Sequence, residues 1–416
     1  MTPRKPVVAL IGTLDTKSAE IAYARDRLRD LGVTALVIDS GILGEVSLTA
    51  DVTRSQVAEY AGRTLEQVQA SGSRGAAVEI MEVGLARLVR ERYDSGGLDG
   101  LLCFGGAEGG LMGAAAAHAL PLGIPKLVVS PAASGRRQFG PFMGESDTMV
   151  MHSVIDILGL NAVARSVFDN AVAAMVGMVT WAGRPPTSDR PSVGITMLGQ
   201  TTPGVMVLAR ELEDHGYEPI IFHANGIGGP AMDKLAADGG LVGVIEYTVS
   251  EAANTEHDGI HATSENRMRA AADAGLPLIV VPGAADFFNQ GAENTVPAHF
   301  LARKHYKHNP VATLVRVTAD EMPALAQLIA SRISHTRGPA EVIFPLGGLS
   351  LVGVGDEALS DHEADARLAD ELEMLLPKSI RLIRSEHHVN EPEFARLVAK
   401  RFFALATEAS KRGGKG

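Results

Sequence analysis

The residues with the clearest capacity for chemistry lie near the start of the chain, where the apolar run 6–11 gives way to Gly-Thr-Leu-Asp-Thr-Lys at 12–17. The pattern predicts a strand, a turn and then a helix. Gly12 lets the backbone approach a ligand, the threonines offer hydroxyl groups, Lys17 adds a positive charge, and the helix presents free N–H groups. This set suits phosphate, although it also fits an ordinary turn capped by Thr13 or Asp15.

Asp15 adds a second requirement to this loop. A carboxylate is a poor neighbour for a bare phosphate, so Asp15 indicates either a Mg²⁺ ion or a ribose hydroxyl between the two groups. Both roles stay open at the level of the sequence.

Two further Gly-rich turns follow predicted strands in the first half. The turn 105–110 (Gly-Gly-Ala-Glu-Gly-Gly) comes after the strand 98–104, and the turn 131–135 (Pro-Ala-Ala-Ser-Gly) comes after the strand 125–130. In a doubly wound parallel sheet such turns share the edge made by the carboxyl ends of the strands, where ligands bind at a topological switch point. Their convergence favours a phosphate-bearing ligand over turns that serve the fold alone.

The elements that must position these turns alternate along the first half. The residues Ile21, Ala24, Leu28 and Leu31 mark one apolar helix face, and a buried strand follows at 33–38, ending in Asp39. Helices are predicted at 50–70, 76–93 and 111–120. This is the βαβ pattern of an α/β protein with a parallel sheet.

The second half repeats the first in outline, which predicts two Rossmann-like, doubly wound parallel-sheet subdomains that arise from an apparent internal duplication. The segment 239–247 parallels 97–104, and 276–286 parallels 124–134, so Ser134 and Asp286 occupy equivalent turns. Prolines, glycine and charges at 181–191 indicate a linker. We expect a first subdomain at 1–184, a second at 192–410 and a tail at 411–416. Within the second, a capping box at 318–321 precedes a helix that Gly338 can end, strands follow at 341–346 and 380–383, and a last helix runs from Pro392 to about Ala409.

Composition excludes several classes of partner. The 416 residues suffice for two cores, and 38 Lys and Arg against 49 Asp and Glu give a net charge of −11, which disfavours nucleic acid or an anionic membrane as a partner. The single Cys103 lies in an apolar run and reads as a core residue. The start of the chain lacks a signal-peptide pattern and the longest apolar run, 171–182, is too short to span a bilayer, so we expect a cytoplasmic protein.

A set of motifs resembles one known family. They are residues 11–17, 105–110, 133–135, Ser146-Asp147 and 154–161 in the first half, and 222–229, 281–287, 308–310 and 388–392 in the second. Together they resemble bacterial uncharacterised proteins related to the N-terminal ATP-binding domain of the plant tomato-mosaic-virus resistance protein. The likeness covers nearly the whole chain.

The resemblance implies two Rossmann-like subdomains, a homodimer, and Mg²⁺ and ATP in the first subdomain. No Walker A motif is present, so a P-loop NTPase is excluded. Lys17 and Asp147 are the candidate catalytic residues, and Asp15 and Asp147 the candidate metal ligands. The candidate nucleotide-binding residues are Gly12, Thr13, Asp15, Thr16, Lys17, Gly105, Gly106, Gly109, Gly110, Ser134, Gly135 and Ser146. This chain departs from the family pattern at Glu108 and Leu111, where Ser and Thr are usual.

Three functions are compatible with these observations. The first is a Mg-ATP-binding enzyme that acts on a small metabolite held between the two halves. The second is a metal-assisted hydrolase or lyase in the second subdomain, because imidazoles and carboxylates suit Zn²⁺ or Mn²⁺; its candidate ligands are His223, His308, His388, Glu246 and Asp286. The third is a non-enzymatic module that binds a small-molecule ligand.

Overall fold

The computed structural model describes residues 4–133, 140–181, 189–264, 266–355 and 357–413. The chain forms two compact units, Met1–Pro186 and Thr187–Gly416. Each is an α/β unit built on its own parallel sheet, which confirms the predicted fold class. The expected linker at 181–191 lies largely outside the described residues.

The first unit contains a five-stranded sheet in the order β2-β1-β3-β4-β5, and every neighbouring pair is parallel. The strands are β1 (Val7–Gly12), β2 (Thr34–Asp39), β3 (Gly100–Phe104), β4 (Lys126–Ser130) and β5 (Met149–His152). From β1 the chain moves first to one side and then to the other, so the topological switch point lies between β1 and β3.

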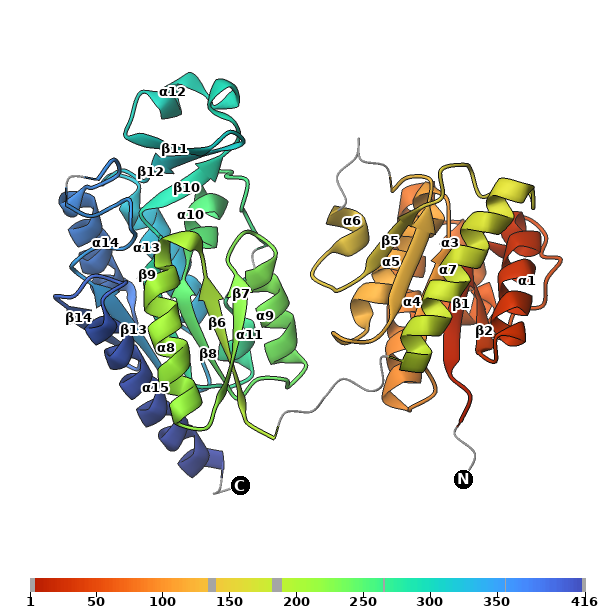
Figure 1. Cartoon of the computed structure of the whole chain (residues 1–416), viewed down its shortest axis with the longest axis horizontal. Coiled ribbons are helices and arrows are strands. Elements are labelled where there is room, and N and C mark those ends of the chain that lie inside the picture. Colours follow the sequence, from red (N-terminus) through yellow and green to blue (C-terminus); the bar gives the residue numbers. More distant parts are fainter. Residues whose placement is uncertain (1–3, 134–139, 182–188, 265, 356, 414–416) are drawn as a thin grey trace. The chain divides into compact units, whose positions relative to one another are not determined.

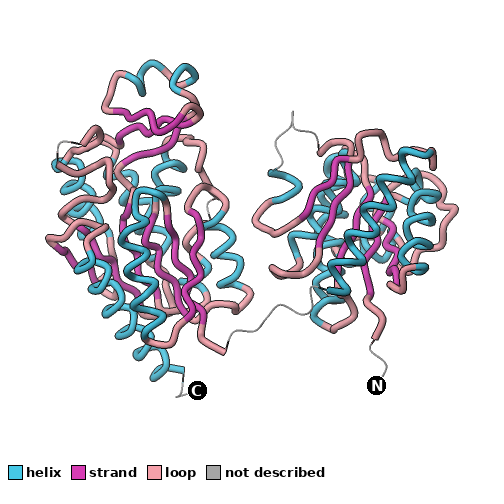
Figure 2. Tube along the Cα trace, in the orientation of Figure 1, coloured by secondary structure: helices cyan, strands magenta, loops and turns pink. Residues whose placement is uncertain are grey.

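Helices cover both faces of this sheet (Figure 1, Figure 2). Alternate residues of β1 enter two different cores: Val8 and Leu10 pack with α1 (Leu14–Asp30) and α7 (Ala162–Trp181), whereas Ala9 and Ile11 pack on the opposite face. The helices of that opposite face are α2 (Arg54–Tyr60), α3 (Leu65–Gln69), α4 (Arg74–Asp94) and α5 (Ala107–Ala119), and the short α6 (Gly140–Met143) lies beside α5. β3 and β4 are buried along their whole length and β1 along nearly all of it, which explains why these strands read as continuous apolar runs.

The segment 50–70, predicted as one helix, consists of two. Thr53 and Gln56 form a capping box at the start of α2, and Thr64 and Gln67 form a second one at the start of α3. The C-cap of α2 is Ala61, and Gly62 follows with a φ of 75°, in the left-handed region that ends helices. The second capping box then begins α3, because its side chains satisfy N–H groups that the new helix leaves open.

Among the described residues, α7 is the one helix whose length and hydropathy would allow it to cross a membrane. Core helices of globular proteins pass the same test. One side of α7 is buried against the sheet through Ala164, Phe168, Ala171, Val172 and Met175.

The second unit has a six-stranded parallel sheet in the order β14-β13-β9-β8-β6-β7. The strands are β6 (Ser192–Met197), β7 (Glu218–His223), β8 (Gly243–Thr248), β9 (Leu278–Gly283), β13 (Ala340–Pro345) and β14 (Arg381–Ser385). Taken from β7, the first five strands follow the same order as the sheet of the first unit. The two sheets therefore share a topology, as the predicted duplication requires.

The helices of the second unit also form two layers. α8 (Thr202–Asp214) and α15 (Pro392–Gly413) pack on one face, and the others pack on or beside the opposite face. These others are α9 (Gly228–Ala237), α10 (Ser250–Glu256), α11 (Ala270–Asp273), α12 (Ala298–Leu301), α13 (Met322–Ile333) and α14 (His362–Leu375). α13 ends at Ile333, before Gly338, and α15 extends into the first residues of the expected tail.

A small antiparallel sheet in the second unit was not predicted. Its order is β10-β12-β11, with β10 (Phe287–Gln290), β11 (His305–Asn309) and β12 (Ala312–Arg316). It follows the turn after β9 and lies beyond the end of the main sheet (Figure 1).

Candidate functional site

A cavity of about 1030 Å³ opens in the first unit at the carboxyl ends of β1, β2 and β3. It lies at the switch point of the sheet, where open α/β sheets bind their ligands. Its walls come from the turns after all five strands and from the start of α4. The lining residues are Thr13, Asp15, Thr16, Lys17, Ser40, Ile42, Leu43, Gln69, Ala70, Gly72, Ser73, Arg74, Ala77, Gly106, Ala107, Glu108, Gly109, Met112, Pro131 and Asp156.

The first turn of α1 supplies one polar wall. The hydroxyl oxygens of Thr13 and Thr16 lie 3.0 Å apart. The Oδ2 atom of Asp15 accepts a hydrogen bond from the Leu43 N–H at 3.2 Å, which ties the helix to the loop after β2. Lys17 has non-helical dihedral angles, φ −128° and ψ 18°, so α1 bends directly after its first turn. All four predicted residues of this turn thus line the cavity.

Asp39, at the end of β2, holds this corner together. Its Oδ1 atom accepts hydrogen bonds from the N–H of Leu14 at 3.0 Å and from the N–H of Gly41 at 2.8 Å. The Asp39 carboxylate therefore caps α1, since Thr13 makes no side-chain cap. Burial raises the pKa of the Asp39 carboxyl above its ordinary range, although these two hydrogen bonds oppose the shift. Sequence patterning located Asp39 at a strand end but gave it no role.

The start of α5 supplies the wall on the other side of the switch point. The helix begins at Ala107, so the predicted glycine turn is partly helical and Glu108 belongs to its first turn. The first N–H groups of a helix have no partner within the helix, and here they begin at the cavity wall. Glu108 accepts a hydrogen bond from Arg74 Nε at 2.6 Å. Arg74, which the sequence did not single out, is largely exposed at the start of α4.

The glycines of this turn divide into two groups. Gly106 and Gly109 line the cavity. Gly105 and Gly110 serve packing: a Cβ at Gly105 would lie 2.2 Å from the carbonyl carbon of Gly109, and one at Gly110 would lie 2.9 Å from the ring of Phe142. Gly12 is also buried at the end of β1, where a Cβ would overlap the Ile21 side chain. These three glycines allow close approach of backbone and are not part of the cavity wall.

Ser146 and Asp147 lie at the end of the sheet opposite to the cavity, which removes them from the candidate site. They precede β5, which begins at Met149, so they stand at the amino ends of the strands. Asp147 forms an ion pair with Lys126 at 2.6 Å and accepts a hydrogen bond from the Gly123 N–H at 2.8 Å. We therefore withdraw Asp147 as a metal ligand or catalytic group. Ser134 and Gly135 lie outside the described residues.

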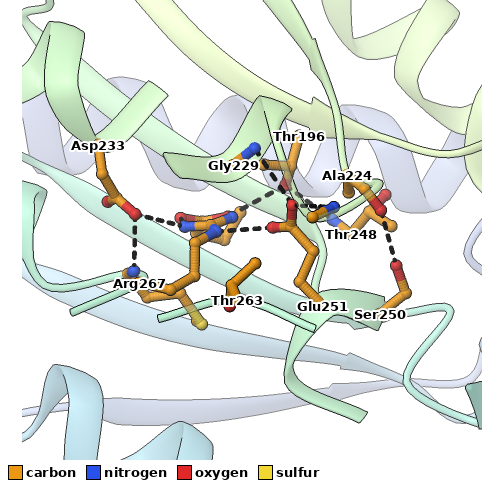
Figure 3. A network of polar contacts seen from close by, with 12 residues as sticks. Thr196, Ala224, Gly229, Asp233, Thr248, Ser250, Glu251, Thr263 and Arg267 are labelled. Carbon is orange, nitrogen blue, oxygen red and sulfur yellow. Dashed lines mark hydrogen bonds and ion pairs between the residues drawn. The ribbon is translucent and has the colours of Figure 1, made fainter. Parts of the chain in front are cut away.

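The second unit does not assemble the predicted metal site, because its buried carboxylates bind arginines. Figure 3 shows the cluster around Arg267. Glu246 on β8 makes two contacts with the guanidinium of Arg267, at 2.5 and 2.6 Å, and Glu251 on α10 makes a third at 2.6 Å. Asp233 on α9 adds a fourth at 3.1 Å. Burial alone would lower the pKa of Arg267, but the three carboxylates hold it above its ordinary value.

The other four predicted metal ligands do not form a common site either. Asp286 is buried and its Oδ2 atom accepts a hydrogen bond from Ser350 at 2.6 Å and lies 3.3 Å from Arg316. His388 is engaged through both ring nitrogens, with the Ser350 carbonyl and the Asn390 N–H. His223 and His308 are exposed. Within the described ranges, no group of three or more His, Cys, Asp or Glu side chains is placed to hold a metal ion.

Cys103 is fully buried in β3, as predicted. Burial raises the pKa of its thiol to about 12, and its Sγ atom lies 3.4 Å from the Gly109 carbonyl. It therefore stays protonated at neutral pH and packs as a core residue.

Comparison with known proteins covers both units. Residues 6–183 match the N-terminal domain of an uncharacterised protein family, UPF0261, and residues 190–406 match its C-terminal domain. A UPF0261 protein of Clostridium tetani is 34% identical over 399 residues, 96% of this chain and 98% of that one. One of Mesorhizobium japonicum is 36% identical over 94% of this chain and 97% of its own. The tomato ToMV resistance protein Tm-1(GCR237) is 32% identical over 97% of this chain, which spans 56% of the tomato protein. The chain therefore belongs to the UPF0261 family and contains both of its domains.

Proposed function

We propose that the first unit binds a phosphate-bearing nucleotide, ATP together with Mg²⁺, in the cavity at its switch point. The observation that carries the proposal is that one cavity of about 1030 Å³ is lined both by the first turn of α1, including Lys17, and by the first turn of α5. Small-molecule pockets span about 300–1,000 Å³, so the space suffices for a nucleotide.

The phosphates fit best at the start of α5. The open N–H groups of a helix start and its dipole favour anions. Glu108 would oppose them, but its charge is offset by Arg74 at 2.6 Å. Lys17, in the opposite wall, supplies a second positive charge. The rest of the lining includes apolar side chains, Ile42, Leu43, Ala77 and Met112, which suit the flat surface of a base.

A Mg²⁺ ion would be shared between the protein and the nucleotide. Mg²⁺ commonly takes one or two carboxylates and completes its shell with phosphate oxygens and water. Asp15 is the carboxylate of the α1 turn that lines the cavity, and each of its oxygens accepts one weak hydrogen bond, which leaves lone pairs available. Asp15 would thus hold the ion without a dedicated cage of protein ligands.

Titration calorimetry of the full chain with ATP, with and without Mg²⁺, tests the proposal. We expect saturable binding at or below millimolar ligand, stronger with Mg²⁺. Inorganic tripolyphosphate serves as a probe for the phosphate part alone. The absence of binding heat with ATP and Mg²⁺ at millimolar concentration would reject the proposal.

We also propose that the protein is a homodimer, on the strength of the family resemblance. Sedimentation velocity at micromolar concentration should show a species of twice the 43.7 kDa chain mass. A monomer alone under these conditions would contradict this.

A further inference from the structure

Ser40 is a buried polar residue in the cavity wall whose side chain has no partner. It follows β2 directly, and its N–H donates to the Gly12 carbonyl at 3.0 Å, so the backbone at this point is fixed. The residue is buried apart from its place in the lining of the cavity, and its hydroxyl makes no hydrogen bond with any described residue. A buried hydroxyl without a partner is unfavourable, and a suitable ligand atom would recover that free energy by pairing with it.

The charges around Ser40 indicate which ligand atom that is. Gly41 allows two carboxylates to come close to this loop, since a Cβ there would lie 2.9 Å from Asp39 Oδ1 and 3.1 Å from Asp15 Oδ1. Except where a Mg²⁺ ion lies between the two groups, as proposed at Asp15, a carboxylate at this distance repels a phosphate charge strongly. A neutral hydroxyl is not repelled and can both donate and accept hydrogen bonds.

We propose that Ser40 binds a ribose hydroxyl of the nucleotide, so that the site selects ribonucleotides. This inference rests on the proposed nucleotide binding and adds the orientation of the ligand. The sugar lies at the end of β2, beside Ser40, and the phosphates extend toward the start of α5 and Arg74. An acidic strand end that reads ribose hydroxyls is a known solution in doubly wound folds.

The test compares ATP with 2′,3′-dideoxy-ATP, which lacks both ribose hydroxyls, and with inorganic tripolyphosphate, which lacks the nucleoside. The wild-type chain should bind ATP about tenfold more tightly than dideoxy-ATP, the effect of one hydrogen bond. Ser40→Ala should bind ATP about tenfold more weakly and dideoxy-ATP unchanged. Binding of tripolyphosphate should be the same in both proteins.

Thr148 provides a matched control. Its hydroxyl is also buried without a partner, but it precedes β5 at the opposite edge of the sheet. Thr148→Val removes that hydroxyl and keeps the side-chain shape, and it should leave the preference for ATP over dideoxy-ATP intact. Without ligand, neither variant should unfold at a lower temperature, because each removes an unsatisfied group.

The outcomes separate the two proposals. If the wild-type chain binds ATP and dideoxy-ATP equally, or if Ser40→Ala keeps the preference, the ribose contact is wrong and nucleotide binding stands. If Ser40→Ala weakens all three ligands equally, Ser40 contacts phosphate and the orientation is wrong. If the wild-type chain binds no nucleotide, both proposals fall.

Discussion

Arg74 Nε donates a hydrogen bond to Glu108 Oε2 over 2.6 Å, and so joins the start of α4 to the first turn of α5. The second unit has a counterpart at the equivalent position. Glu251, the second residue of α10, accepts hydrogen bonds from the N–H groups of Gly226 and Gly229, at 2.9 and 3.3 Å, at the start of α9. In each unit a glutamate after the third strand thus binds the start of the preceding helix.

Replacement of Glu108 should strengthen nucleotide binding. Glu108→Ser removes a carboxylate from the proposed phosphate position and frees Arg74 to pair with the ligand. Because the pair is partly exposed and screened, we expect a gain of roughly three- to tenfold in ATP affinity, largest without Mg²⁺. Titration calorimetry measures it. Glu79→Ser, an equal change of charge on the exposed side of α4, should have little effect, and an equal gain in both variants would show that only net charge matters.

Removal of Lys17 should have the opposite effect. Lys17→Ala deletes a positive charge from the cavity wall and should weaken ATP binding by about 1–3 kcal/mol, the range for a charge-assisted hydrogen bond. Lys5→Ala, which removes an exposed lysine before β1, is the control. Unchanged ATP affinity in Lys17→Ala would exclude the α1 turn from the phosphate site.

Loss of Arg267 should destabilise the second unit strongly. Arg267→Leu leaves Glu246, Glu251 and Asp233 buried without their cation, and removal of one partner from such a cluster costs about 3–5 kcal/mol. Urea unfolding followed by circular dichroism should show an earlier transition for the variant. Arg210→Leu, on the exposed side of α8, should change the midpoint little, and equal midpoints for Arg267→Leu and wild type would contradict the structural role.

Two buried acids make stability depend on pH. Burial raises the pKa of Asp365 to about 7 and that of Asp233 to about 6, above the ordinary value near 3.8. The folded state therefore binds protons more readily than the unfolded state, so these groups should make the protein more stable as the pH falls from about 7 toward 5. Asp365→Asn removes one titrating group and keeps an oxygen for Arg316. The urea midpoint of the variant minus that of wild type should be larger at pH 8 than at pH 5. An equal difference at the two pH values would refute the raised pKa of Asp365.

The central strands of the two main sheets could be predicted from sequence because they are buried and largely apolar on both faces. Residues 98–104, for example, are apolar except for Asp99 and Gly100, and β3 begins at Gly100 and contains the apolar residues that follow. The duplication could be inferred from the sequence because the apolar strands recur in the same order in the two halves. β5 was missed because it is short and partly exposed on both faces. That omission misplaced Asp147: once a strand begins at Met149, the residue before it must lie at the amino edge.

The polar partners were the least predictable part of the molecule. Arg267 lies in an irregular segment far along the chain from Glu246, and no local spacing connects the two. Arg74 and Glu108 are likewise joined only by the packing of α4 on α5. A signal existed for Arg74, since Ser73 before a helical pattern marks a helix start. Together with Asp39, these residues show that the strand-end loops could be located from sequence, whereas their charge pairing required the fold.

Each main sheet is built from one continuous stretch of the chain, which has a consequence for folding during synthesis. All five strands of the first sheet come from residues 7–152, and all six of the second come from residues 192–385. Neither sheet needs a strand from the other unit. On the ribosome, where domains fold as units in the order in which they emerge, the proposed nucleotide cavity can therefore be complete before translation of the second sheet has finished.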